Sequence, residues 1–162
     1  MKLLKKTVCA LLTICLLNVS VCTPVFAAEV NSAVPKLEAL VTAIDTQPGS
    51  YAASRSTTFI DTTIDMAYSA EGMRVEIHTD MNMTASVVGV KDIKIQKKGF
   101  WGWTTVATST GGEAYNVGGC VVTLTYTGIE YGEIYRVTCT HYGNVDEYRE
   151  LYHETEGFTC IY

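Results

Sequence analysis

Apolar and polar residues alternate in short stretches along the chain from about residue 58 onward. These stretches are rich in Val, Ile, Thr and Tyr, and Gly, Asn or Asp separates them at intervals of about eight to twelve residues. Alternation places successive side chains on opposite faces of a strand, and regularly spaced short strands are typical of antiparallel β-sandwiches and barrels. We therefore expect an all-β domain over residues 58–162. The predicted strands are residues 62–69, 73–81, 91–98, 103–109, 120–128, 133–142 and 147–155.

Residues 28–57 have a different composition and a different pattern. They contain two of the three prolines and are rich in Ser, Ala and Thr. Apolar residues recur at helical spacing after Pro35, which suits a first helical turn. These residues are Leu37, Leu40, Val41 and Ile44. Because so short a helix is marginal on its own, we expect residues 28–57 to be a flexible leader with one short helix at most.

The first 27 residues have the features of a secretory signal peptide. Lys2, Lys5 and Lys6 precede an uncharged apolar run, and small residues lead up to a break between Ala27 and Ala28. A retained membrane anchor is the alternative, although Thr, Asn and Ser within the run favour cleavage. We expect cleavage after Ala27, secretion into the extracellular space and no stable membrane insertion.

Removal of this segment would make the chain more acidic. The whole chain has 12 basic and 17 acidic residues and a formal net charge of −5. Nine basic residues and all the acidic ones follow residue 27, which gives a formal net charge of −8. Nucleic acids and anionic membranes attract basic surfaces, so we expect neither as a partner.

Three cysteines remain after the predicted cleavage: Cys120, Cys139 and Cys160. Three thiols allow one internal bridge at most, and no C-x-x-C sequence points to a redox or zinc site. By parity Cys120 and Cys139 face inward, on consecutive strands that run in opposite directions. We predict a Cys120–Cys139 bridge, with Cys160 free or joined to another chain. The alternative is that both inward thiols stay reduced as small core residues.

The sequence GIEYGEIYRVTCTHYGN, residues 128–144, resembles the turn into strand F of immunoglobulin-like and fibronectin type III domains. In those domains an aliphatic residue precedes a tyrosine by six positions, with a glycine between them, and Ile129, Gly132 and Tyr135 match. The resemblance implies a single immunoglobulin-like (fibronectin type III-like) antiparallel β-sandwich of about seven strands. It also implies that the Tyr135 hydroxyl bonds a backbone group in the preceding loop. Val137 stands where immunoglobulin domains have a cysteine, so their disulfide is not implied.

A second resemblance covers residues 93–106, IKIQKKGFWGWTTV, which look like the C to C′ hairpin of such domains. More narrowly, residues 58–155 are similar to small secreted single-domain proteins of Gram-positive bacteria. Those proteins share an IQKK, W-T-T-V and Y-R-V series and have no defined activity. The resemblance therefore implies a fold and no chemistry.

Three aromatic residues gather at the turn of this hairpin. Trp103 matches a tryptophan that lies against the sheet in the resembling proteins, so we expect it to pack in the core in preference to contacting a ligand. Phe100 and Trp101 stand in the turn itself, where a tight hairpin can hardly bury both. Either they are exposed and stack on a sugar ring or fill a partner's pocket, or they cover an open sheet edge.

Residues that could carry catalysis are few. We expect His141 and His153 on adjacent strands but over about 16 Å apart, too far for one metal ion. No serine-hydrolase or metalloprotease motif occurs. An acidic run near the end of the chain reads as a solvated strand face. It consists of Glu147, Glu150, Glu154 and Glu156, with Tyr148 and Tyr152 interleaved.

Taken together, these features predict a secreted, non-catalytic recognition module that needs no metal and no cofactor. We expect it to bind an extracellular protein or a glycan through its loops and the Phe100–Trp101 pair. The alternative is a small diffusible effector, such as an antimicrobial or toxin-like factor. A secreted enzyme is a third and minor possibility.

Overall fold

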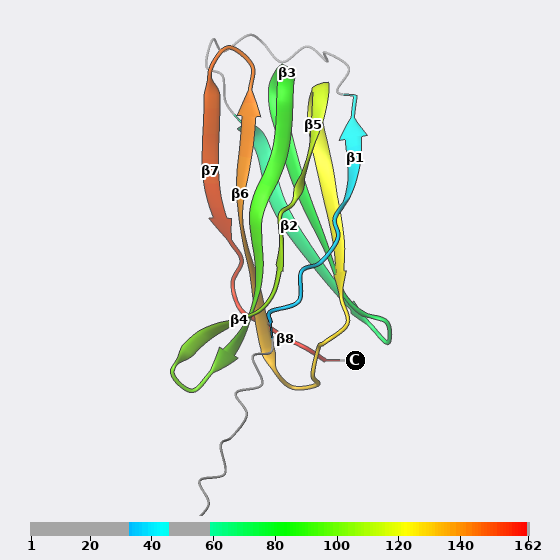
Figure 1. The fold of residues 1–162 in the computed structure, drawn as a ribbon, viewed down its shortest axis with the longest axis vertical. Helices are drawn as coiled ribbons and strands as arrows, with labels where there is room; N and C mark the ends of the chain where they lie inside the picture. Colours follow the sequence, from blue (N-terminus) through cyan, green and yellow to red (C-terminus); the bar gives the residue numbers. More distant parts are fainter. Residues whose placement is uncertain (1–32, 46–58, 162) are drawn as a thin grey trace, which may run out of the picture. The chain divides into compact units, whose positions relative to one another are not determined.

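The computed structural model describes residues 33–45 and 59–161. The predicted signal peptide, and the rest of the predicted leader, lie outside these residues. The described part of the chain forms eight strands, and every pairing between them is antiparallel (Figure 1). They are β1 (Leu40–Ile44), β2 (Phe59–Ser69), β3 (Gly72–Gly99), β4 (Gly102–Ser109), β5 (Gly112–Tyr126), β6 (Ile134–Asn144), β7 (Tyr148–Glu154) and β8 (Phe158–Thr159).

The long strand β3 organises the sheet. It pairs with β2, β4, β5 and β6, and the main strand order is β1-β5-β3-β6-β7. Two predicted strands, 73–81 and 91–98, are its two ends, and residues 82–90 continue the strand between them. Register shifts lie between Asp80 and Ala85 against β5, and between Lys91 and Lys94 against β6. Irregularities of this kind bend a strand and increase its twist.

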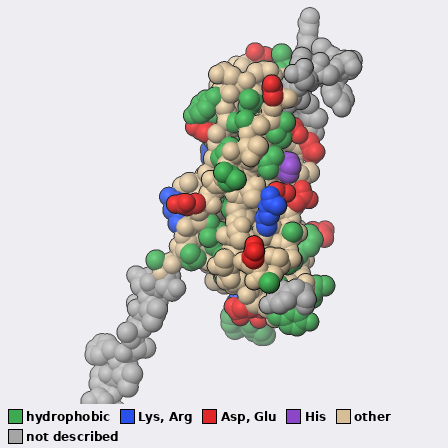
Figure 2. All heavy atoms as spheres, turned by 90° about the vertical axis from the view of Figure 1, so that its right-hand side faces the viewer, with side chains coloured by type: hydrophobic (Ala, Val, Ile, Leu, Met, Phe, Trp, Pro, Cys, Tyr) green, Lys and Arg blue, Asp and Glu red, His purple; other side chains and the backbone are tan. Residues whose placement is uncertain are grey.

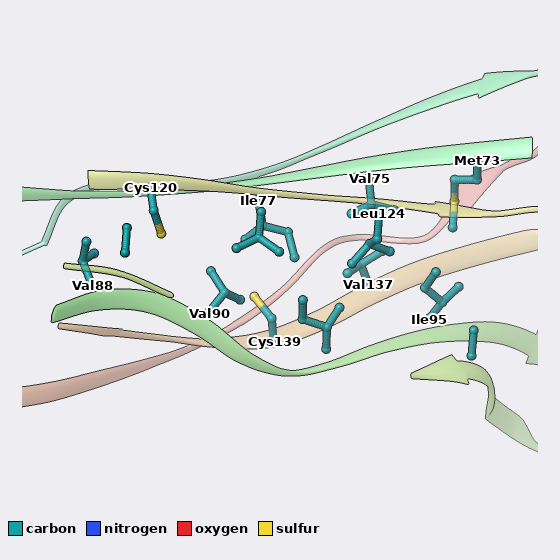
Figure 3. Close-up of a cluster of buried hydrophobic side chains, with 14 of the residues drawn as sticks. Met73, Val75, Ile77, Val88, Val90, Ile95, Cys120, Leu124, Val137 and Cys139 are labelled. Atoms are coloured by element: carbon teal, nitrogen blue, oxygen red, sulfur yellow. The ribbon is translucent and has the colours of Figure 1, made fainter. Parts of the chain in front are cut away.

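The apolar core lies between the two ends of this bent sheet. In Figure 3, Met73, Val75, Ile77, Cys120 and Leu124 point from one side toward a second group on the other. The second group is Val88, Val90, Ile95, Val137 and Cys139. Alternate residues of each strand are buried there, as the period-two pattern predicts.

The prediction of an all-β, antiparallel fold is confirmed. The two separate sheets of the predicted immunoglobulin-like sandwich are not observed among the described strands. The strands belong to one eight-stranded sheet that does not close. The physical reason is the length of β3. This one strand runs along both sides of the core and pairs with the strands of each side, so all the strands belong to one sheet.

Strand β1 lies where we expected a flexible leader with one short helix at most. Residues Leu40–Ile44 pair with β5, from Leu40 opposite Thr123 to Ile44 opposite Gly119. The preceding residues are also tied down, because the Leu37 amide donates to the Thr108 carbonyl at 2.7 Å. A short helix gains little by itself, whereas the edge of β5 offers a ladder of backbone hydrogen bonds.

A tyrosine corner fixes the start of β6. Tyr135 is fully buried, and its hydroxyl accepts a hydrogen bond from the Glu130 amide at 2.9 Å. Ile129 packs against the core from the same loop. Tyr135 lies opposite Lys97 in the register of β6 and β3. The corner therefore stands beside the base of the β3–β4 hairpin.

Candidate functional site

Phe100 and Trp101 form the exposed tip of the β3–β4 hairpin, which projects from the lower end of the sheet in Figure 1. Their side chains are 91% and 95% exposed. The two rings contact each other edge to face, with centroids 4.9 Å apart and planes at 86°. They do not fold back to cover a sheet edge.

Two glycines allow this turn. Gly99 pairs with Gly102, so Phe100 and Trp101 are the two loop residues of a tight hairpin. Gly102 has a φ of 131°, which residues with a Cβ rarely adopt. The tight turn leaves the two aromatic side chains no position within the sheet, and this explains their exposure.

Trp103 lies outside the buried core, contrary to the predicted core position. It is half-buried opposite Lys98, whose ammonium lies 5.6 Å from the ring centroid. The Arg136 guanidinium stands 4.5 Å from the same centroid. The register of β3 and β4 shifts between Ile95 and Gln96, after which Trp103 shares the outer face with Lys98. Trp103 therefore packs against two cationic side chains at the base of the hairpin.

Polar contacts hold the base of the hairpin to its surroundings. The Lys97 ammonium lies 2.8 Å from the Glu130 carboxylate, and this hydrogen bond raises the pKa of Lys97. Arg136 donates from Nε to Gln96 Oε1 at 2.8 Å and lies 3.4 Å from the Glu154 carboxylate. These contacts join β3 to the tyrosine corner, β6 and the end of β7, so the exposed tip stands on a base fixed at several points.

Cys120, Cys139 and Cys160 are free and buried, so the predicted Cys120–Cys139 bridge is absent from the structure. Both side chains were correctly expected to point inward (Figure 3). However, β3 lies between β5 and β6, so the strands that carry them are not neighbours. Burial raises the pKa of Cys120 to about 11 and that of Cys139 to about 12, so both remain thiols. Cys160 is fully buried too, which leaves it inaccessible to another chain.

The predicted separation of His141 and His153 is wrong. His141 Nε2 lies 3.2 Å from His153 Nδ1. The register pairs Asn144 with Tyr148 and Cys139 with His153, so the turn falls at residues 145–147. The sequence pattern placed the turn earlier, at GNVD (143–146). Moving a turn by one residue shifts the facing strand by two, and this is why spacing alone misplaced the pair.

These histidines belong to a buried polar chain that crosses the core. Thr79 Oγ1 lies 2.7 Å from His141 Nδ1, and Cys139 Sγ lies 3.5 Å from His141 Nε2. Burial, together with nearby His153, lowers the pKa of His141 to about 4, so the ring is neutral near neutral pH. Within residues 33–45 and 59–161 there is no group of three His, Cys, Asp or Glu arranged to hold a metal ion.

Other surface features do not coincide with the hairpin tip. A shallow depression of about 500 Å³ lies beside β1. Its lining residues are Lys36, Leu37, Glu38, Ala39, Thr110 and Gly111. Figure 2 shows small groups of hydrophobic side chains separated by acidic and other side chains. In the part of the chain that the structure describes, no helix is long and apolar enough to cross a membrane.

No family model, no curated protein and no solved structure matches this chain. The chain is thus placed as an all-β antiparallel sheet domain of about 130 residues, with no family or homologue identified.

Proposed function

We propose that this protein is a secreted, non-catalytic recognition module that binds an extracellular protein or a glycan through the tip of the β3–β4 hairpin. The observation that carries the proposal is the near-complete exposure of Phe100 and Trp101 at one turn. Aromatic side chains contribute large apolar areas at binding surfaces and are common among the residues that dominate binding energy.

The hairpin base supports the same proposal. Trp103 packs under Lys98 and Arg136, and Lys97 pairs with Glu130, so side-chain contacts from β3, β4 and β6 hold the base of the hairpin. A site that is already ordered retains more of its contact energy as affinity. The proposal also includes an immunoglobulin-like domain type and a cleaved signal peptide, both expected from the sequence. It includes no cofactor and no nucleic-acid partner.

A binding screen with matched variants tests the proposal. The labelled protein is applied to an array of glycans and to a panel of extracellular proteins, and affinities are measured for each hit. Phe100→Ala with Trp101→Ala should weaken binding at least about tenfold, the loss expected when an aromatic anchor is truncated.

Met83→Ala is the control, since Met83 is an exposed apolar residue elsewhere on β3. It should leave the affinities unchanged. If the double variant and the control bind every hit as tightly as the original protein, the tip is not the binding site.

A further inference from the structure

A second aromatic surface lies on the outer face of the sheet, over β5, β3, β6 and β7. The register brings its residues together, because Gly89 pairs with both Glu113 and Tyr142, and Tyr142 pairs with Glu150. We call this surface the tyrosine face. It consists of Tyr115, Tyr142, Tyr148 and Tyr152 with Glu113, Glu150, Glu154 and Lys91.

Each tyrosine of this face is held by a carboxylate. The Tyr142 hydroxyl donates to Glu113 at 2.5 Å, and the Tyr115 hydroxyl donates to the same carboxylate. On β7 the acceptor is two residues away along the strand. Tyr148 donates to Glu150 at 2.7 Å, and Tyr152 donates to Glu154 at 3.1 Å. The rings are therefore fixed before any ligand arrives.

Gly89 makes room for the floor of this surface. A Cβ atom at Gly89 would lie 2.7 Å from the Tyr142 ring, so the ring lies directly over the backbone of β3. Tyr142 is only 9% exposed, whereas Tyr115, Tyr148 and Tyr152 are 61%, 49% and 62% exposed. Three accessible rings thus surround a buried one.

Two of the three carboxylates of this face lie beside a cation. Lys91 bonds Glu150 and lies 5.7 Å and 5.8 Å from the ring centroids of Tyr142 and Tyr148. Arg136 lies beside Glu154. Lys94 stands on the same side of the neighbouring strand β3, opposite Thr138, which in turn faces Glu154. Glu150 and Glu154 therefore each lie beside a cation, and the surface offers acceptors and donors together.

We propose that the tyrosine face is a binding site for a neutral oligosaccharide. Sugar hydroxyls both donate and accept hydrogen bonds, which suits interleaved carboxylates and cations, and the apolar faces of sugar rings suit fixed tyrosine rings. Tyr148 and Tyr152 are four residues apart on β7, about 13 Å along the strand. The occupant is therefore a chain of several sugars. A polyanion or a polycation would meet like charges here.

The test titrates the purified protein with neutral hexasaccharides, namely cellohexaose, chitohexaose, xylohexaose and mannohexaose, with calorimetry as the readout. We expect at least one to bind with a Kd below about 1 mM and with little dependence on salt, since the ligand has no charge. Tyr148→Ala with Tyr152→Ala should weaken that binding at least tenfold. Tyr148→Phe keeps the ring and should retain most of it.

The control is Met83→Ala, at an exposed residue of β3 outside both surfaces, which should leave hexasaccharide affinity within twofold of the original. Circular dichroism verifies that each variant, including Phe100→Ala with Trp101→Ala at the hairpin tip, is folded. Octalysine and polygalacturonate serve as charged probes. The proposal is overturned if no neutral hexasaccharide binds, if the charged probes bind more tightly, or if the tip variant loses the binding and the tyrosine variant keeps it. Because the two surfaces are changed separately, either proposal can fail alone.

Discussion

His141 is a titratable side chain that is fully buried in the core. It contacts Thr79, Cys139 and His153, and its pKa falls from 6.5 to about 4. The folded protein therefore favours the neutral ring, whereas the unfolded chain takes up a proton as the pH falls through 6.5. Stability from this residue is present above pH 6.5 and is lost as the pH falls toward 4.

This shift predicts a measurable dependence of stability on pH. The free energy of unfolding should fall between pH 7 and pH 4.5, and the full pKa shift corresponds to about 3 kcal/mol. His141→Gln should remove this part of the slope in urea unfolding. His78→Gln, at a partly exposed histidine, is the control and should keep it. An unchanged slope in His141→Gln would show that the buried ring is not responsible.

The position of Trp103 outside the core gives a second prediction. Trp103→Ala should lower the free energy of unfolding by about 1–2 kcal/mol, through lost cation contacts and partial burial. Ile95→Ala, in the neighbouring core position of β3, should cost about 2–5 kcal/mol. Urea unfolding of both variants measures the difference. If Trp103→Ala lowered the free energy of unfolding more than Ile95→Ala, Trp103 would be a core residue after all.

At the scale of elements, the β3–β4 hairpin depends on its two glycines differently. Gly102 has positive φ and open space around it, whereas a Cβ at Gly99 would make an ordinary contact at 3.6 Å. Gly102→Ala should therefore cost about 1–3 kcal/mol through backbone strain. Gly99→Ala should cost well under 1 kcal/mol. Thermal and urea unfolding compare the pair, and equal losses would contradict the turn geometry.

Strand β1 owes its conformation to its partner. Its amides should exchange with solvent slowly, because the strand pairs with β5 along its whole length. Hydrogen exchange measured by mass spectrometry should show that residues 40–44 are protected relative to a free peptide. Only the amides that bond β5 are protected, because β1 is an edge strand. Exchange as fast as in a free peptide would mean that β1 is not paired in solution.

At the scale of the whole molecule, one folded sheet encloses three separate thiols. We expect native protein to resist alkylation at Cys120, Cys139 and Cys160, because all three are buried. Unfolding should make the thiols of these three residues reactive. Peptide mapping of the oxidised protein is the decisive measurement. A Cys120–Cys139 or Cys139–Cys160 peptide pair would show that the core holds a bridge.

Local features of the chain were predictable because each depends on a few neighbouring residues. Period-two alternation indicated the antiparallel strands and many of their buried positions, and the resemblance to immunoglobulin-like domains at Ile129 and Tyr135 implied a corner hydrogen bond. The tight turn at Phe100 and Trp101 left exposure as one of two interpretations, and the structure shows the rings exposed. The acidic run on β7 was recognised, but its tyrosines gain meaning only beside Glu113 and Lys91 from other strands.

The sequence by itself determined the all-β class, the inward positions of the central strands and the tight turn at the hairpin tip, because period and turn chemistry act over a few residues. Only the tertiary structure decided which strands are neighbours. Strand β3 lies between β5, which carries Cys120, and β6, which carries Cys139. The turn after β6 brings His141 and His153 close together. Strand β1 forms because β5 offers an edge for pairing. Neighbour order depends on packing between distant segments, and a shift of one residue turns a strand over.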